Sequence, residues 1–325
     1  MTLISKPVPA KGLPRLFRYL MYALPLLCLS PLFAQPLGER VGPQLPFLTS
    51  SARAAAMADA GGAIIDDFSG FGSNPGVLGL IRKSVIDYST QRVQNGIAFE
   101  HLGIAYKTTT LDAIAFSFDI LHFGGTDFYT NGDVRKLGYE VRTGLAYGRL
   151  LSEGLSTGVN FQALMTTTGP NTVWSFVGDF GFTYTPGKYI RYGLSIKGLG
   201  SDYKISAPIL QTDVFTSRIS KVLALSLVFD YPFADQTQKI VLALQNEKVL
   251  GETGLIYKIG IEYIPIWSPG FHMATRLGML IRERYSEPRF GLGAGYAQFS
   301  LDYAYRYSIQ DSQPSHLVTL AFSWR

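Results

Sequence analysis

The sequence predicts an all-β fold, a transmembrane antiparallel β-barrel of about fourteen strands with an N-terminal hatch segment that plugs it. Three observations carry this prediction. Bulky and small side chains alternate along many short stretches, and no uninterrupted apolar stretch after residue 34 is long enough for a membrane helix. Aromatic residues make up 13% of the chain, 34 residues are glycine and only 16% are charged, which is unusual for a soluble protein. A membrane barrel is apolar at alternate positions only, so it combines all three features.

Residues 1–34 are predicted to be a cleavable signal peptide. Four basic residues precede the apolar run LMYALPLLCLSPLFA, which ends at the small residue Ala34. Two prolines interrupt this run, and it is shorter than the ~20 residues of a spanning helix, so an uncleaved anchor is the less favoured alternative. Cys28, the only cysteine, follows Leu27 instead of a small residue. We therefore expect no lipid anchor, and a mature chain without disulfides or thiolate metal sites.

The charge of the mature chain excludes one class of partner. Four of the 29 Lys and Arg residues lie before residue 35, which leaves 25 against 24 Asp and Glu residues. A nucleic-acid-binding protein would show a surplus and clustering of basic residues. No nucleic-acid partner is therefore expected.

Residues 81–325 are predicted to form the barrel. In DAIAFSFDIL, for example, Ile114, Phe116 and Phe118 lie on one face and Ser117 and Asp119 on the other. In a soluble sandwich the polar face would be the outer one, whereas in a membrane barrel the apolar face meets lipid and the charges point into the lumen. Turn signals divide the chain into fourteen strands, at 83–89, 97–107, 112–123, 137–149, 155–168, 173–186, 190–201, 217–230, 237–247, 254–264, 271–284, 287–296, 298–307 and 315–325.

Residues 35–80 are predicted to be the hatch. About eight strands already use up their own side chains to fill a barrel, so a fourteen-stranded lumen needs a plug. The stretch SSARAAAMADAGGAIIDDFSGFGSNPG, residues 50–76, is rich in Ala, Gly and Ser and can lie close to a wall. Arg53 is expected to join the lumenal charges, and Asp66 and Asp67 to meet lumenal arginines.

The charged residues expected to face the lumen form the largest group of candidate functional residues. They could line a solute path or grip the hatch, or they could pair among themselves inside a wet barrel, because charges are costly only on the lipid face. The residues expected to face the lumen are Asp119, Glu140, Arg142, Asp179, Arg191, Lys197, Lys258, Glu262, Arg276, Arg282, Asp302 and Arg306.

No motif indicates an enzyme, a cofactor or a metal site. GLSTG, residues 154–158, matches a nucleophile pattern that has meaning only at a strand-to-helix elbow, whereas Ser156 begins a predicted strand. The four histidines, His101, His122, His272 and His316, are scattered singly without carboxylates at ligand spacing. The chain is therefore expected to be non-enzymatic.

The N-terminal stretch resembles a known family signature. TSSARAAAMADAGGAIIDDFSGFGSNPGVLG is similar to the signature of FadL-type outer-membrane barrels and, within them, of the PorV/PorQ branch. The matching residues are Ser51, Ala52, Arg53, Ala54, Ala55, Gly61, Gly62, Asp66, Asp67, Asn74 and Pro75. Ala58 and Asp59 depart from it, because glycines are common at their positions, and Arg325 follows the usual terminal aromatic residue.

The resemblance implies a fourteen-stranded barrel with a hatch in the bacterial outer membrane, in contact with its lipid. It also implies two alternative roles. PorV/PorQ-like members serve type IX protein secretion, with secretion-system proteins or secreted substrates as partners. FadL-like members are diffusion channels for long-chain fatty acids or other hydrophobic molecules. The absence of an obvious apolar lumenal patch in the sequence favours the secretion role.

Overall fold

The computed structural model describes most of the chain from residue 48 onward. The described ranges are 48–65, 67–93, 97–123, 128–130, 133–135, 138–168, 171–200, 203–206, 214–217, 219–233, 237–268, 270–283, 285–308 and 313–324. The expected signal peptide, residues 35–47 of the expected hatch and Asp66 lie outside them. None of the described helices is long and apolar enough to cross a membrane.

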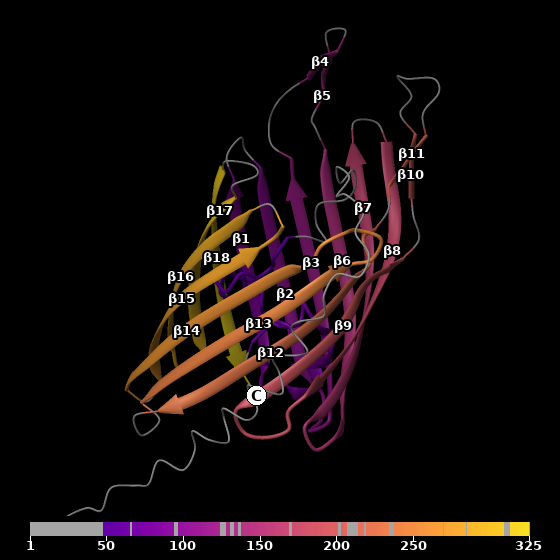
Figure 1. Cartoon of the computed structure of the whole chain (residues 1–325). Helices are drawn as coiled ribbons and strands as arrows, with labels where there is room; N and C mark the ends of the chain where they lie inside the picture. Colours follow the sequence, from indigo (N-terminus) through magenta and orange to yellow (C-terminus); the bar gives the residue numbers. More distant parts are fainter. Residues whose placement is uncertain are drawn as a thin grey trace, which may run out of the picture.

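Fourteen antiparallel strands form a closed barrel, in the order β1-β18-β17-β16-β15-β14-β13-β12-β9-β8-β7-β6-β3-β2 (Figure 1). Residues Ser84 and Trp324 pair where the first and last strands close it. The strands are β1 (Ser84–Val93), β2 (Ala98–Lys107), β3 (Asp112–His122), β6 (Tyr139–Ser152), β7 (Leu155–Thr168), β8 (Asn171–Tyr184), β9 (Ile190–Gly200), β12 (Val222–Phe233), β13 (Gln238–Val249), β14 (Ile256–Ser268), β15 (Phe271–Ile281), β16 (Ser286–Tyr296), β17 (Phe299–Ser308) and β18 (Gln313–Trp324). The predicted fold class and strand number are confirmed.

The two ends of the barrel differ in their connections. At the inner end, where β1 begins and β18 ends, neighbouring strands are joined by short turns. At the outer end, two connections hold two-stranded hairpins that the sequence analysis treated as loops, namely β4 (Phe128–Thr130) with β5 (Asp133–Arg135) and β10 (Tyr203–Ser206) with β11 (Val214–Ser217). The second hairpin includes residue 217, so barrel strand β12 begins five residues later than predicted, at Val222. Short turns on the periplasmic side and longer loops outside are typical of bacterial outer-membrane barrels.

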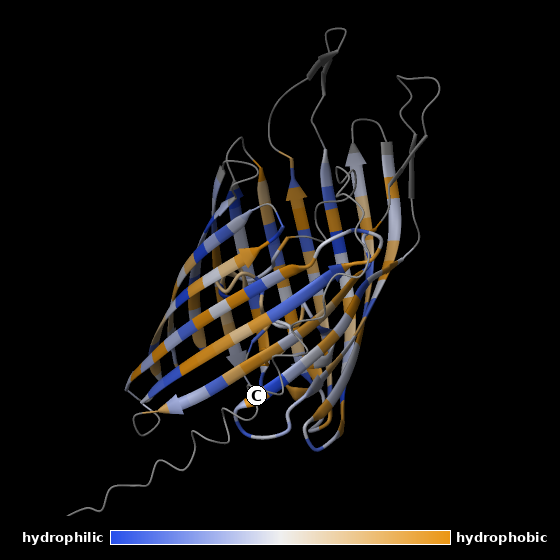
Figure 2. Cartoon of the chain, viewed as in Figure 1, coloured by the Kyte–Doolittle hydropathy of each residue, from blue (hydrophilic) through white to orange (hydrophobic). Residues whose placement is uncertain are grey.

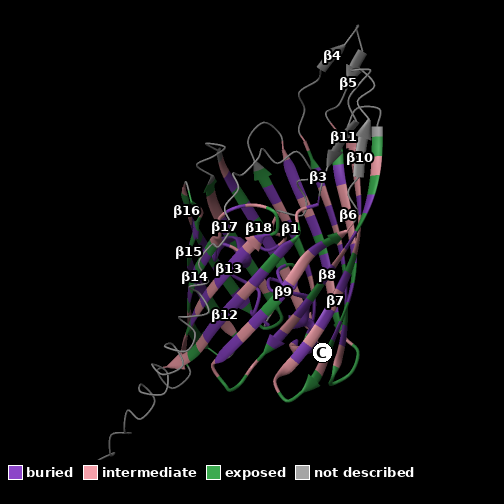
Figure 3. Ribbon diagram, turned by 45° about the vertical axis from the view of Figure 1, so that its right-hand side comes forward, coloured by how far each residue is buried: buried purple, intermediate pink, exposed green. Residues whose placement is uncertain are grey.

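Alternation of side chains along the strands gives the barrel an apolar outside (Figures 2 and 3). In β3, Ile114 and Phe116 are exposed, whereas Ala115, which lies between them, is buried. Asp119, further along the same strand, is also buried. This is the reverse of a soluble sandwich, in which charged side chains would lie on the exposed face.

The depth of a residue on the apolar face sets the cost of a charge there. Leu145 and Leu151 point outward from the same strand, β6, and are 62% and 53% exposed. Leu145 lies near the middle of the strand and Leu151 at its inner end. We expect Leu145→Lys to cost about 2 to 4 kcal/mol and Leu151→Lys about 0 to 1 kcal/mol. Reversible unfolding in lipid vesicles measures both, and equal losses would contradict the assigned membrane position.

The hatch crosses the lumen from the outer to the inner end (Figure 1). Leu48 packs near Phe99 and Leu121, at the outer ends of β2 and β3. The short helix α2 (Ala52–Ala56) lies against β15 to β18, and the 3-10 helix η2 (Pro75–Leu80) lies against β6 to β9 near the inner end. Hatch and wall therefore share their buried core. The hatch residues in it include Met57, Ala60, Ala63, Ile64, Ile65, Phe68, Phe71, Val77 and Leu78.

Candidate functional site: the hatch anchors and a membrane-facing groove

Arg53 ties the hatch to the wall through a buried ionic chain. Ser51 caps α2, and its side-chain oxygen accepts a hydrogen bond from the backbone N–H of Ala54. From this helix, Arg53 donates to both carboxylate oxygens of Glu262 on β14, at 3.0 and 2.5 Å, and to Asp67 of the hatch at 2.7 Å. The fully buried carboxylate of Glu262 thus receives the forked geometry that a guanidinium provides.

The chain continues along the wall, because Arg276 contacts Glu262 and Asp302, both at 2.6 Å. Three expected lumenal residues, Glu262, Arg276 and Asp302, therefore meet Arg53 in one network. The partner of Asp67 in it is Arg53 of the hatch itself.

A second ionic anchor involves Asp59, which the sequence analysis noted only as a departure from the family signature. Ala58 and Asp59 have φ values of 54° and 60°, in the left-handed region that favours glycine. This backbone turn directs Asp59 to Arg289 on β16, at 2.5 Å, and to the hydroxyl of Thr49. Burial acts to raise the pKa of the Asp59 carboxyl, but the positive charges of Arg289 and Lys258 outweigh it and hold the pKa below its usual value.

Asn74 and Pro75 fasten the opposite side of the hatch. Asn74 caps η2 by accepting from the backbone N–H of Gly76 at 2.9 Å, and Pro75 takes the first position of the helix, where no N–H is needed. The Asn74 amide group also donates to the carbonyl of Phe182 on β8 at 2.9 Å. One side chain therefore shapes the hatch and binds it to the wall.

Glycines in the wall make room for the hatch on both sides. Four glycines on β6 to β9 face η2 and Gly62, namely Gly148, Gly158, Gly181 and Gly193. We refer to these four residues as the glycine track. On the opposite wall, Gly260 and Gly278 face Met57, where an added Cβ at Gly260 would lie 2.6 Å from the Met57 Cβ. The backbones can approach only because these residues have no side chain.

A methyl group on the glycine track is expected to destabilise the protein. In Gly181→Ala, the new Cβ would overlap the amide oxygen of Asn74. The Asn74 side chain cannot easily move away, because hydrogen bonds to the backbone of Gly76 and Phe182 hold it in place. We expect a loss of about 1 to 3 kcal/mol. Gly187→Ala is the matched control, because nothing lies within 4 Å of a Cβ built there, in the turn after β8. An equal, small effect of both changes in unfolding experiments would show that the hatch does not lie against the track.

Most of the other expected lumenal charges are buried on the inner face of the barrel, against carboxylates or amides, but Arg282 lies beyond the end of β15. Asp119 accepts from Arg142 at 2.8 Å and Arg191 contacts Asp230 at 3.2 Å and the hatch carbonyl of Ala63 at 2.9 Å. Lys258 contacts Glu247, and Asp179 accepts hydrogen bonds from Asn160, Gln162 and the backbone N–H of Gly198. Glu140 is buried, and Lys197 and Arg306 are half-buried. Arg282 lies over the ring of Tyr285. Among the described residues, no group of His, Cys, Asp and Glu could hold a metal ion.

The lumen also has an apolar cluster, which the sequence analysis missed. Phe99 and Leu121 point inward at the outer ends of β2 and β3, and Leu48, Ile97 and Phe123 pack against them. Phe99 and Leu121 belong to strands whose inner faces are otherwise polar or small, so the cluster becomes visible only when the fold brings its members together. We refer to these five residues as the outer apolar cluster.

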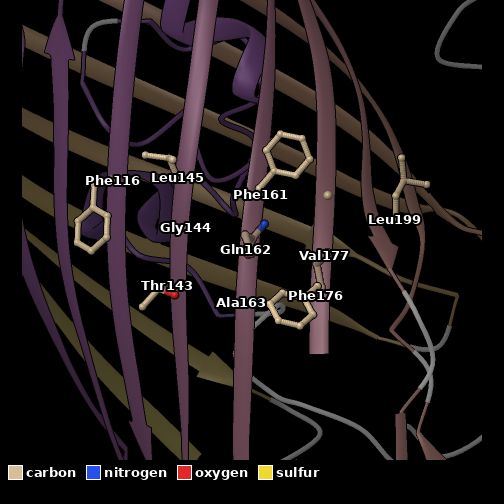
Figure 4. Close-up of a pocket in the computed structure, with 11 residues that line it drawn as sticks. Phe116, Thr143, Gly144, Leu145, Phe161, Gln162, Ala163, Phe176, Val177 and Leu199 are labelled. Atoms are coloured by element: carbon tan, nitrogen blue, oxygen red, sulfur yellow. The ribbon is translucent and has the colours of Figure 1, made fainter. Parts of the chain in front are cut away.

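A groove of about 450 Å³ opens on the membrane face of β3 and β6 to β9 (Figure 4). Its apolar walls are Phe116, Leu145, Phe161, Phe176 and Leu199, and its floor includes the small residues Gly144, Ala163 and Gly178. The hydrogen-bond register between β8 and β9 shifts between Gly178 and Phe180, which leaves Asp179 without a paired residue on β9. The groove therefore lies beside an irregular part of the wall.

Comparisons with known proteins place the fold. No protein-family model and no curated protein sequence matches the chain. Among solved structures, it is similar to a FadL homologue of Pseudomonas aeruginosa, with a TM-score of 0.54, 11% identity, and 85% of this chain and 98% of that chain covered. It is also similar to the toluene transporter TodX of Pseudomonas putida (TM-score 0.54, 10% identity, 90% and 99% covered) and to the monoaromatic hydrocarbon channel CymD (0.53, 12%, 85% and 96%). The chain thus has the fold of FadL-like outer-membrane barrels.

Proposed function

We propose that this protein is a passive channel of the bacterial outer membrane for hydrophobic molecules. The observation that carries the proposal is the apolar groove, which opens to the membrane beside the irregular β8–β9 pair of a barrel whose axis is filled by the hatch. A water-soluble molecule gains nothing from such a surface, whereas a hydrophobic molecule loses its unfavourable contact with water there.

The outer apolar cluster supports transfer of hydrophobic molecules from the outside into the membrane. Phe99 and Leu121 lie at the end of the lumen that faces the long connections, so they offer a first apolar surface to a molecule arriving from outside. Its path then leads past the wall of small residues at Gly144 and Gly178 to the membrane, and the anchored hatch keeps water from following along the axis.

The similar solved structures support this role over the alternative. They are described as a FadL homologue, a toluene transporter and a monoaromatic hydrocarbon channel, and none of these descriptions is of an enzyme. Type IX protein secretion, which the PorV/PorQ resemblance implies, is the second candidate, but no described contact and none of these three solved structures favours it.

Filling the groove tests the proposal. Bacteria that produce the protein are exposed to an uncharged lipophilic dye that fluoresces in membranes, and the rate of dye uptake is measured. Ala163→Trp places a large ring on the groove floor, whereas Leu292→Trp places it on an exposed, membrane-facing position of β16. We expect rapid uptake with the unchanged protein and Leu292→Trp, and slow uptake with Ala163→Trp. Uptake no faster than in cells without the protein would contradict the function, and rapid uptake with Ala163→Trp would contradict the route.

A further inference from the structure

His101 lies between two carboxylates inside the barrel. It points inward from β2 and is buried, as are Asp87 on β1 and Asp119 on β3. Its Nδ1 is 2.6 Å from Asp119, and its Nε2 is 3.6 Å from Asp87. This arrangement joins three neighbouring strands through one imidazole ring.

The hydrogen-bond pattern fixes one proton of the ring. Asp119 also accepts from the guanidinium of Arg142, so it is an ionised acceptor and Nδ1 of His101 must donate to it. In a neutral ring the other nitrogen, Nε2, is then a bare acceptor that faces a carboxylate oxygen of Asp87. Two acceptors in a buried site repel each other unless a second proton lies between them.

The two arginines near the site contact other carboxylates. Arg142 contacts Asp119, and Arg53 contacts the nearby acid of the hatch, Asp67. Among the described residues, neither the Asp87 oxygen that faces His101 nor Nε2 has a hydrogen-bond partner. The charge balance of the site therefore depends on whether one proton is present between these two atoms.

The hatch rests directly on this site. The ring of Phe68 lies 5.4 Å from the His101 ring, centroid to centroid, and 4.9 Å from that of Phe71 in the hatch core. Gly103, beside them on β2, makes the contact possible, since a Cβ there would lie 2.8 Å from Nε2 and 2.9 Å from the Phe68 ring. A change in the hydration of the pair must therefore disturb the position of Phe68.

We propose that Asp87 and His101 form a proton-operated latch for the hatch. With a proton between them, the pair is compensated and Phe68 packs on a dry surface. When alkaline conditions remove this proton, Asp87 faces a bare nitrogen, water enters to solvate it, and the hatch loosens around Phe68. The latch regulates the hatch whatever molecule the channel carries, so it does not depend on the proposed function.

A spin label on the hatch tests the latch. Gly72 is exposed, and a Cβ there meets only the hydroxyl of Ser50, at 3.7 Å. Because Cys28 belongs to the expected signal peptide, Gly72→Cys provides a single attachment site for a nitroxide. We expect a less mobile spectrum at about pH 7, where the hatch is fixed, and a more mobile one at about pH 10, where the proton between Nε2 and Asp87 is removed. An unchanged spectrum over this span would overturn the proposal.

Three substitutions in the labelled protein separate the latch from a general effect of pH. Asp87→Asn supplies a permanent amide donor to Nε2, so the hatch should stay immobile at both pH values. His101→Gln leaves Asp87 buried without a cation, so the hatch should be mobile at both. His316→Gln, on the membrane face and hydrogen-bonded to Tyr303, should keep the transition. Heat-modifiable migration in gels verifies that each barrel is folded, and a pH transition that persists in folded Asp87→Asn would also overturn the proposal.

Discussion

Deletion of residues 50–76 is expected to convert the closed protein into an ion-conducting pore. The deleted segment carries α2, the anchors Arg53 and Asp59 and the contacts of Asn74, so its loss empties a lumen wider than fourteen strands can fill with their own side chains. Wall charges such as Glu262 and Arg289 then face water instead of a buried partner, which spares the barrel the cost of isolated buried charge. We expect large, steady current steps in planar bilayers from the deletion variant and none from the intact protein.

Two outcomes would contradict the role of this segment as a plug. One is a steady, porin-like conductance of the intact protein, and the other is a folded deletion variant that conducts no better than the intact one. Heat-modifiable migration of the variant provides the control, because it separates a closed pore from a barrel that has not formed.

Arg53→Met is expected to cause the largest loss of stability from a single substitution. It removes one of the two arginines that contact the fully buried Glu262, and it removes the arginine that contacts Asp67. Arg276 remains, but it also contacts Asp302, so the three carboxylates of the network are left with a single guanidinium. Breaking a buried ion pair in this way costs about 3 to 5 kcal/mol. Reversible unfolding in lipid vesicles measures the loss.

Arg92→Met is the matched control. Arg92 also forms an ion pair, with Glu100 at 2.8 Å, but its side chain is 65% exposed. Exposed pairs contribute less than about 1 kcal/mol, so this variant should unfold almost as the unchanged protein does. Equal losses in the two arginine variants would show that Arg53 is not buried in an ionic anchor.

The barrel could be predicted from the sequence because the membrane imposes a strict rule on every strand. Outward residues such as Phe116 and Leu145 must be apolar, so the alternation shows each strand and its orientation. The outer hairpins β4–β5 and β10–β11 lie beyond this constraint, and their residues therefore show no such signal. The same reason explains why β12 was predicted to begin too early, within the segment that forms β11.

The contacts inside the lumen could not be predicted in the same way. Arg53 and Glu262 are 209 residues apart, and His101 meets Asp119 only because the two residues are directly opposite in the β2–β3 register. Spacing along the chain led us to interpret His101 as an isolated histidine. Asp59 was missed for a different reason, because its side chain reaches Arg289 through a left-handed backbone that an aspartate rarely adopts.

The central claim, that the protein admits hydrophobic molecules and excludes water-soluble ones, is tested most directly by paired uptake in one culture. Cells with and without the protein receive a lipophilic dye and a small hydrophilic sugar together, and both uptake rates are measured. The account predicts that the protein accelerates uptake of the dye and leaves that of the sugar unchanged, because the groove is apolar and the hatch fills the axis. Unchanged dye uptake, or faster uptake of the sugar, would contradict it.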